Sequence, residues 1–97
     1  MGTRVDTIEF SWDEAKRQAV SAVRGIDFLD LAKALLDGRP LLTMPRRRGE
    51  EDRFVSVGLV GGRFYALVWT QRETAIRLIT ARRARDEEER QYRDLHG

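Results

Sequence analysis

The strongest constraint on the fold is a pair of adjacent glycines between two segments of β-forming residues. Gly61 and Gly62 separate Phe54–Val60, which is rich in β-branched residues, from Phe64–Thr70, which is almost entirely apolar. Two adjacent residues that both tolerate positive φ favour the tight turns that connect antiparallel strands. The sequence therefore predicts a β-hairpin, and its more apolar strand should lie in the centre of a sheet.

Other segments show a weaker strand pattern. We expect an edge strand at residues 4–10, where polar and apolar residues alternate. A short strand is expected at Leu41–Met44, and Pro45 should end it because proline lacks the amide hydrogen that a sheet needs. Residues 46–52 contain no core residue, so we interpret them as a polar loop. Ala75–Thr80 should form the last strand.

Helical signals come before and after these strands. Ser11 and Glu14 have the spacing of a capping box, in which each side chain bonds the amide of the other residue. Gly25 is a natural end for this first helix. Asp27 is expected to cap a second helix with one apolar stripe. A third helix is predicted over about residues 84–94, with acidic residues near its positive N-terminal end.

The order of these elements predicts an α+β fold. Strands that follow helices, instead of alternating with them, indicate a layered α+β domain. We expect a small antiparallel sheet of about four to five strands, with two N-terminal helices and one C-terminal helix. A length of 97 residues fits a single domain, 1–97. The helices should cover one face of the sheet and leave the other face free.

Positive charge is concentrated in the middle of the chain. Residues 39–85 hold eleven basic and four acidic side chains, a net charge of +7, whereas both flanking segments are acidic overall. Sixteen of the eighteen basic residues are arginine, which binds phosphate through two parallel hydrogen bonds where lysine acts as a point charge. The pattern is compatible with a phosphate-binding surface, and equally with plain solvation of an arginine-rich chain.

Composition excludes several classes of site. The sequence contains no cysteine, which excludes disulfides, thiolate nucleophiles and cysteine metal sites. The spacing of acidic residues and histidine is not typical of a metal site, and we expect neither a metal nor a cofactor. No apolar segment approaches the ~20 residues that span a membrane, and the N-terminal residues lack the apolar core of a signal peptide. We therefore expect a cytoplasmic protein.

A series of motifs occurs in order between about residues 8 and 93. They are Phe10-Ser11-Trp12-Asp13 with Ala15-Lys16, Gly25-Ile26-Asp27-Phe28, Glu51-Asp52-Arg53-Phe54 with Gly58, Val68-Trp69-Thr70, Ile76-Arg77-Leu78-Ile79-Thr80-Ala81-Arg82-Arg83-Ala84, and Tyr92 in the last helix. Together they resemble the BrnT family of small ribonuclease toxins. The segment that begins at Ile76 is the most specific of these matches.

The resemblance implies a RelE-like compact fold and an endoribonuclease that blocks translation. It also implies a ribbon-helix-helix antitoxin as the partner that neutralises the toxin. In that family the two proteins assemble into a heterotetramer, which represses its own operon and contacts DNA through the antitoxin. An isolated chain could instead form a homodimer through an exposed edge strand.

The chain departs from the family pattern at the end of the first helix. Where the family usually has an asparagine and then a Lys-His pair, this chain has Val20, Val23 and Arg24. Val23 can neither transfer a proton nor bind phosphate. Arg24 can bind phosphate, but a guanidinium keeps its proton at neutral pH and is a poor proton donor or acceptor. The single histidine, His96, lies beside the C-terminus and is interpreted as a tail residue.

Cleavage of RNA by its own 2′-hydroxyl requires a base, stabilisation of charge on the phosphate, and an acid for the leaving oxygen. Glu51 is the candidate base, because neighbouring arginines would keep it ionised. Arg53, Arg77 and Arg82 are candidates for stabilising the phosphate. Tyr92 is a candidate acid, and Tyr65 a weaker one. Further candidates for binding RNA phosphates are Arg24, Arg46, Arg47, Arg48 and Arg83.

Two alternatives to an enzyme remain open from sequence. The chain could be a catalytically impaired relative that acts as a protein- or RNA-binding module, or a generic basic RNA-binding domain. A strand arginine is often only solvated, and Glu51 in a run of acidic residues is often a plain loop residue. The enzyme hypothesis requires that Glu51, Arg53, Arg77 and Arg82 lie on one face of the sheet.

Overall fold

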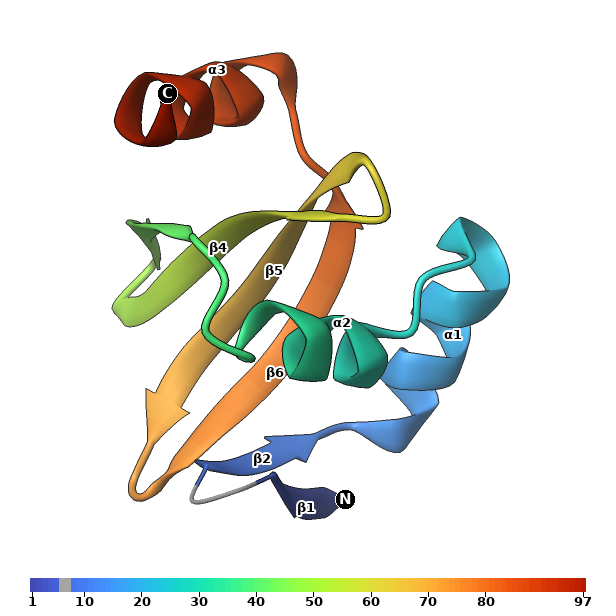
Figure 1. Ribbon diagram of the computed structural model, residues 1–97. Coiled ribbons are helices and arrows are strands. Elements are labelled where there is room, and N and C mark those ends of the chain that lie inside the picture. Colours follow the sequence, from blue (N-terminus) through green and yellow to red (C-terminus); the bar gives the residue numbers. More distant parts are fainter. Residues whose placement is uncertain (6–7) are drawn as a thin grey trace.

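The computed structural model describes residues 1–5 and 8–97, which form one mixed sheet with helices on both of its faces (Figure 1). The elements are β1 (Gly2–Val5), β2 (Ile8–Trp12), α1 (Glu14–Arg24), α2 (Phe28–Leu35), β3 (Leu42–Arg48), β4 (Glu51–Val60), β5 (Arg63–Arg72), β6 (Ala75–Arg83) and α3 (Asp86–His96). The strand order in the sheet is β1-β2-β6-β5-β4-β3. The α+β class and the three helices are therefore confirmed.

The central hairpin forms as predicted. β4 and β5 pair antiparallel from Phe54↔Trp69 to Val60↔Arg63. Gly61 and Gly62 connect them with φ values of 58° and 78°, which is the backbone that a tight hairpin turn requires. β6 then pairs antiparallel with β5 on its other side, so the most apolar strand does lie in the centre.

The N-terminal edge differs from the prediction of one strand over residues 4–10. β1 and β2 form an antiparallel pair there, and residues 6 and 7 of the predicted strand lie outside the described residues. β2 in turn pairs with β6 in parallel. The sheet thus has six strands among the described residues and is mixed, instead of four to five antiparallel strands. Two parallel neighbouring strands need a long connection between them. Here the connection from β2 to β6 contains most of the domain. Local sequence patterns cannot predict a pairing between strands so far apart in the chain.

The two N-terminal helices are capped by aspartates. The N-cap of α1 is Asp13, whose side chain accepts a hydrogen bond from the Lys16 amide at 3.3 Å. The predicted capping box at Ser11 is wrong, because Ser11 is still part of β2. Asp27 caps α2 as predicted and accepts from the Leu29 amide at 2.9 Å. Gly25, with φ of 67°, ends α1 as predicted.

The prediction of a loop after Pro45 is also wrong. β3 continues through Pro45 to Arg48 and pairs with β4 as far as Arg48↔Glu51. Proline is tolerated on an edge strand when its missing amide hydrogen would face solvent, and β3 is such an edge. The turn comes later, at Gly49, which has φ of 62°. Three arginines assigned to a loop therefore belong to the sheet.

Helices α1 and α2 cover one face of the sheet, which we call the helical face. Its core includes Phe10, Phe28, Leu35 and Leu67, each at most 1% exposed. Gly58 lets α2 approach, because a Cβ at this position would lie 2.5 Å from a methyl group of Leu35. The described part of the chain contains no helix long and apolar enough to cross a membrane.

The opposite face is divided into a covered half and an open half. In the covered half, Val55, Val57, Phe64 and Ala66 are buried, and Tyr92 of α3 packs against them. The expectation that this face would be entirely free is thus wrong, because α3 folds back onto it. The other half lies toward the start of β4 and the end of β5, beyond this apolar cluster, and it holds the site described below.

Candidate functional site

Strand register brings most of the predicted arginines onto the open half. Residues that face each other in a sheet point to the same side. Arg46 pairs with Arg53, and Arg48 pairs with Glu51, so these four side chains share one face. Two like charges directly opposite each other are destabilising. The Glu51 carboxylate, which is bound to Arg53, offsets part of this repulsion between Arg46 and Arg53.

The sheet splits beside these residues. Pairing between β4 and β5 ends at Phe54↔Trp69, and beyond that point residues 51–53 pair only with β3, while residues 70–72 pair with β6. Figure 1 shows the two hairpins diverging at this end of the sheet. We call the gap between residues 51–53 and 70–72 the fork. The Thr70 hydroxyl closes its inner end by donating to the Asp52 carbonyl at 2.6 Å.

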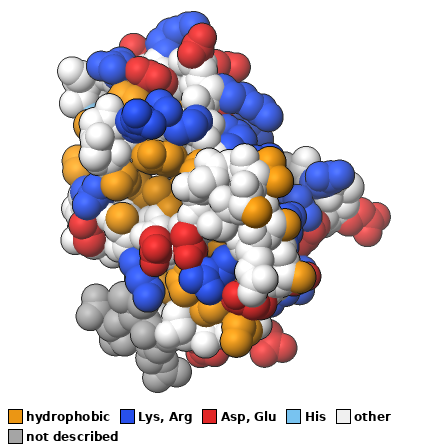
Figure 2. Space-filling model, turned by 90° about the vertical axis from the view of Figure 1, so that its right-hand side faces the viewer, with side chains coloured by type: hydrophobic (Ala, Val, Ile, Leu, Met, Phe, Trp, Pro, Cys, Tyr) orange, Lys and Arg blue, Asp and Glu red, His pale blue; other side chains and the backbone are white. Residues whose placement is uncertain are grey.

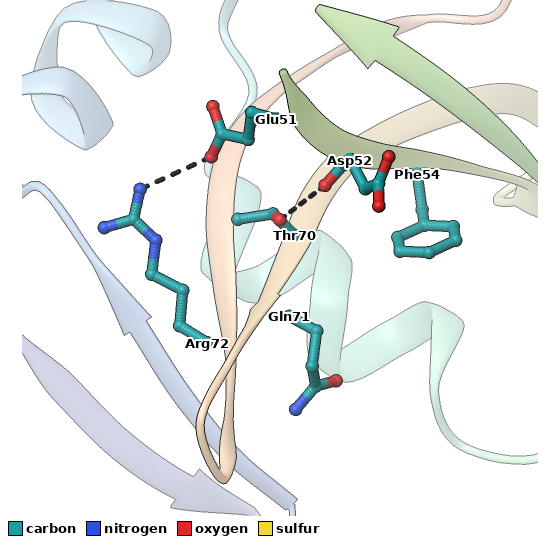
Figure 3. Close-up of a pocket in the computed structure, with 6 residues that line it drawn as sticks. All are labelled: Glu51, Asp52, Phe54, Thr70, Gln71 and Arg72. Carbon is teal, nitrogen blue, oxygen red and sulfur yellow. Dashed lines mark hydrogen bonds and ion pairs between the residues drawn. The ribbon is translucent and has the colours of Figure 1, made fainter.

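Glu51 lies between two arginines at the mouth of the fork. Its carboxylate accepts hydrogen bonds from Nε and Nη2 of Arg53 at 3.2 and 3.1 Å. It also accepts one from Arg72 across the fork at 3.4 Å, which Figure 3 shows. These contacts, Arg53 first, hold the pKa of Glu51 below its usual value. Glu51 is therefore ionised at neutral pH, and its charge is neutralised by partly exposed arginines.

Arg77 lies on the same face, two strands away. It pairs with Thr70 of β5 on one side and with Ser11 of β2 on the other. Arg77 and Arg53 therefore lie on the same face, on opposite sides of the point where the sheet splits. Within the described residues the half-buried Arg77 guanidinium makes no hydrogen bond or ion pair. Among the described residues, Arg77 is thus an unpaired cation on the face that carries Glu51 and Arg53.

Arg82 is on this face as well, but its charge is already neutralised. Its Nη1 and Nη2 donate to the two oxygens of Glu88 at 2.7 and 2.9 Å. Glu88, at the start of α3, also accepts from the Arg85 amide at 2.8 Å and is 3% exposed. The Arg82 contact, opposed by burial, lowers the pKa of Glu88. This pair fastens α3 to β6, so Arg82 could meet a phosphate only by releasing Glu88.

Arg24 hydrogen-bonds to the open edge of β6. β2 pairs with β6 only as far as Leu78, so the following residues lack a neighbouring strand on that side. The Arg24 guanidinium donates to the Ala81 carbonyl at 2.8 Å and to the Thr80 hydroxyl at 3.2 Å. It thus satisfies backbone that would otherwise face solvent. The preceding Val23 is 84% exposed and contributes nothing to a site.

Arg83 and Tyr65 belong to the helical face. The Arg83 guanidinium carbon lies 5.5 Å from the centre of the Tyr65 ring, and its Nε donates to the Phe64 carbonyl. Tyr65 borders a shallow apolar hollow whose other lining residues include Ile26, Leu31 and Val60. Figure 2, seen from the side of α1, shows hydrophobic side chains gathered on this side of the molecule beside Lys and Arg side chains. These two residues are therefore separate from the open half.

The remaining predicted residues also lie apart from Glu51. Arg47 is on the opposite side of β3 and is 3.7 Å from Asp52. Tyr92 packs edge-on against Phe64 at 5.0 Å, at the other end of β4 and β5. The His96 ring lies 4.7 Å from the Tyr92 ring at a tilt of 49°, and its Nε2 hydrogen-bonds the Leu41 carbonyl at 2.8 Å, so His96 is held in place and is not a loose tail. At ~3.3 Å per residue, Tyr92 is more than about 20 Å along the strand from Glu51.

Three functional or anchoring residues escaped the sequence prediction. Arg72 lies beyond the strand predicted to end at Thr70, although continued alternation of Val68, Thr70 and Arg72 would have placed it on the same face as Arg53. Thr70 was placed in the strand without a role. Glu88 was interpreted as part of an acidic helix end, and its contact with Arg82 depends on how α3 folds back. The described residues contain no cluster of three or more His, Cys, Asp or Glu side chains suited to a metal ion.

The fold and this surface define a small α+β protein that presents an arginine-lined sheet face with a carboxylate among the arginines. The family model described as the ribonuclease toxin BrnT of type II toxin–antitoxin systems matches residues 12–88. The chain belongs to this family, as its motifs indicated. Membership supports ribonuclease activity in general and implies an antitoxin as partner. A comparison with curated proteins finds no match.

Proposed function

We propose that the open half of the sheet is the active site of an endoribonuclease that needs no metal ion. The observation that carries the proposal is that Glu51, Arg53 and Arg77 share one face, with Glu51 ionised and Arg77 without a partner among residues 1–5 and 8–97. A carboxylate among arginines offers a proton acceptor next to groups that stabilise a charged phosphate.

In the proposed reaction Glu51 accepts the proton of a ribose 2′-hydroxyl. The 2′-oxygen attacks the adjacent phosphorus, the bond to the 5′-oxygen breaks, and a cyclic phosphate forms. Arg53 and Arg77 stabilise the extra negative charge on the phosphate oxygens, because preorganised donors act where charge develops. Tyr92 lies too far from Glu51 to protonate the same leaving oxygen, so that proton comes from solvent water.

Flanking arginines extend the surface along a strand of RNA. Arg46 and Arg48 continue it across β3, and Arg72 continues it across the fork. Each phosphate contact releases counterions, so RNA affinity should fall steeply with salt. Three other predicted arginines lie away from the open half: Arg24 at the edge of β6, and Arg47 and Arg83 on the other face. They would contact RNA only outside the open half. Arg82 would contact RNA only after its ion pair with Glu88 is broken.

We further propose that the chain inhibits translation by cleaving RNA in the cytoplasm. A ribbon-helix-helix antitoxin would neutralise it in a heterotetramer that contacts DNA through the antitoxin. Family membership supports the antitoxin in general, and the motif resemblance supports its type. A homodimer of the isolated chain would use an open sheet edge, either β1 or β3.

Growth of bacteria that express the chain alone tests the toxin proposal. Induction of the wild type should arrest growth and protein synthesis, and Arg77→Ala should relieve the arrest at equal soluble expression. Arg63→Ala is the matched control, because Arg63 is an exposed arginine beside the hairpin turn, at the opposite end of β5. Harmless expression of a well-folded wild type would contradict the proposal.

One observation favours a binding module as the second candidate. The position that usually carries a Lys-His pair holds an exposed Val23 and an Arg24 whose guanidinium is occupied by the backbone of β6. If those groups are essential for proton transfer, the chain binds RNA without cleaving it. Salt-sensitive RNA binding by a purified chain that leaves the RNA intact would select this candidate.

A further inference from the structure

The fork contains a hollow that extends from Glu51 to residues with no role in the proposed cleavage, among them Asp52 and Phe54. It has a volume of about 440 Å³ and is lined by Glu51, Asp52, Phe54, Thr70, Gln71 and Arg72. This volume falls in the range of small-molecule sites, roughly 300–1,000 Å³. In Figure 3, Glu51 and Arg72 lie on one side of the hollow, and Asp52 and Phe54 lie on the other. A nucleotide in the fork would therefore have its base and its phosphate contacted by different residues.

Phe54 provides an aromatic wall. Its ring stacks on Trp69 with 4.6 Å between centroids and an interplanar angle of 26°. Trp69 is itself fixed, because its Nε1 donates to the Ser56 hydroxyl at 2.9 Å. Phe54 is only partly buried and borders both the fork and a second hollow toward Arg46 and Arg47. Partly exposed aromatic rings held in place are the usual surfaces on which single-stranded bases stack.

The polar groups beside Phe54 are acceptors. Gln71 uses its Nε2 to donate to the carbonyls of Glu73 and Ala75, at 3.1 and 3.3 Å, which leaves its amide oxygen for a ligand. Asp52 has a side chain that is 76% exposed, and its carboxylate lies 3.7 Å from Arg47. A carboxylate can only accept hydrogen bonds when ionised. The hollow is thus suited to a base edge that presents donors.

We propose that the fork binds a guanine base, stacked on Phe54 and hydrogen-bonded to Asp52. Among the four RNA bases, only guanine presents two adjacent donors, N1–H and N2–H, that match the two oxygens of a carboxylate. Adenine and cytosine place a ring acceptor beside their amino group, and uracil places carbonyls beside its N3–H. RNA-binding proteins commonly recognise unstacked bases through such edges.

Two neighbouring residues of β4 then have different roles, Asp52 in binding the base and Glu51 in cleavage. Asp52 and Glu51 are adjacent and point to opposite sides of the strand. A guanine held by Asp52 would place its own ribose and phosphate near Glu51 and Arg53. The inference rests on the proposed ribonuclease function and adds to it that cleavage occurs next to guanine.

The test combines cleavage with binding. Cleavage positions are mapped on RNAs that differ by a single base, for wild type, Asp52→Asn and Glu50→Gln. Binding is measured with DNA oligonucleotides, which lack the reactive 2′-hydroxyl, carrying one guanine, inosine or adenine. We expect cleavage beside guanine, weaker binding of inosine because it lacks the N2 amino group, and a guanine preference that falls about ten-fold or more in Asp52→Asn. Glu50→Gln, two residues before Asp52 in the chain and outside the residues that line the hollow, should keep the preference.

A second variant checks the stacking wall. Phe54→Leu should weaken binding of every oligonucleotide about ten-fold, with thermal unfolding measured to confirm that the fold is intact. Cleavage without base preference, or a guanine preference retained in Asp52→Asn, would overturn the inference and leave the ribonuclease proposal standing. Guanine-selective, Asp52-dependent binding without any cleavage would support the base site and contradict the enzyme.

Discussion

The sheet face opposite α1 and α2 carries an arginine–glutamate pair in each half, and the two pairs differ in nearly every respect. In the covered half, Glu88 is 3% exposed and accepts three hydrogen bonds, two of them from Arg82. In the open half, Glu51 has a side chain that is 36% exposed and is shared by Arg53 and Arg72, whose side chains are 24% and 60% exposed. The first pair is saturated and shielded, whereas the second is reached by solvent.

This difference distinguishes charged residues that stabilise the fold from charged residues that are available to a ligand. A buried pair with all its hydrogen bonds made costs much to break, because the remaining partner would be an uncompensated charge. A partly exposed pair contributes little to stability, so a phosphate can displace it at small cost. The net positive charge of the sheet face is therefore a weaker guide to function than whether each arginine is bound in a buried ion pair.

The largest expected effect is on stability in the covered half. Glu88→Ala leaves Arg82 without a partner and removes the contact to the Arg85 amide, so the free energy of unfolding should fall by about 3 kcal/mol. Denaturant unfolding measures it. Glu89→Ala is the control, because its contact with Arg93 is an exposed helix pair that contributes at most about 0.5 kcal/mol. Equal effects of the two variants would remove the distinction between the halves.

The next effect is on activity in the open half. Arg53→Ala should lower the rate of RNA cleavage about 100-fold, since it removes a donor to the phosphate in the transition state. Single-turnover cleavage of a short RNA measures this rate, with Arg63→Ala as the control. The free energy of unfolding should change by less than about 1 kcal/mol. A stability loss that accounts for the lost activity would show that Arg53 has the same role as Arg82.

A pH dependence follows from the covered pair. The pKa of Glu88 in the folded chain is lowered, mainly by Arg82, from an ordinary value of 4.5. A lowered folded pKa contributes stability that is present above pH ~4.5 and is lost as the pH falls through the folded value. The difference in unfolding free energy between wild type and Glu88→Gln should therefore shrink in acid. A difference that stays constant from pH 7 to pH 3 would rule out this linkage.

The smallest effect concerns the flanking arginines. Arg48→Ala should weaken RNA binding uniformly across sequences and reduce the slope of log affinity against log salt by about 0.7, as expected for one phosphate contact on a single strand. Binding titrations at several salt concentrations give this slope. The same slope in Arg48→Ala and wild type would mean that the RNA does not cross β3.

Local chemistry predicted the parts of the fold that are fixed locally. Gly61 and Gly62 define the hairpin, and Asp27 and Gly25 define helix ends, because each acts through its own backbone or nearest amides. The edge strand through Pro45 was missed because proline is compatible with a strand only at a sheet edge, and edge positions depend on the whole topology. The parallel pairing of β2 with β6 is non-local for the same reason.

In the candidate site, too, only features that depend on nearby residues in the chain could be predicted from sequence. Glu51 and Arg53 could be found from the Glu51-Asp52-Arg53-Phe54 motif, although Glu51 was assigned to a loop. They share a face because both belong to β4, two residues apart. Arg72 joins them only because the sheet splits at Phe54 and Trp69. Arg82 matched the family motif as well as Arg77 did, yet α3 brings Glu88 to it. Which arginine is free and which is occupied is decided by tertiary packing.

Cleavage of RNA in excess chelator by wild type and Glu51→Gln, measured side by side, tests the central claim most directly. Glutamine keeps the size of Glu51 and can still accept hydrogen bonds from Arg53, but it cannot take the 2′-hydroxyl proton. The account predicts that the wild type cleaves without metal and that Glu51→Gln still binds RNA while cleaving at least about 100-fold more slowly. Cleavage that requires added metal, or that continues at the wild-type rate in Glu51→Gln, would contradict it.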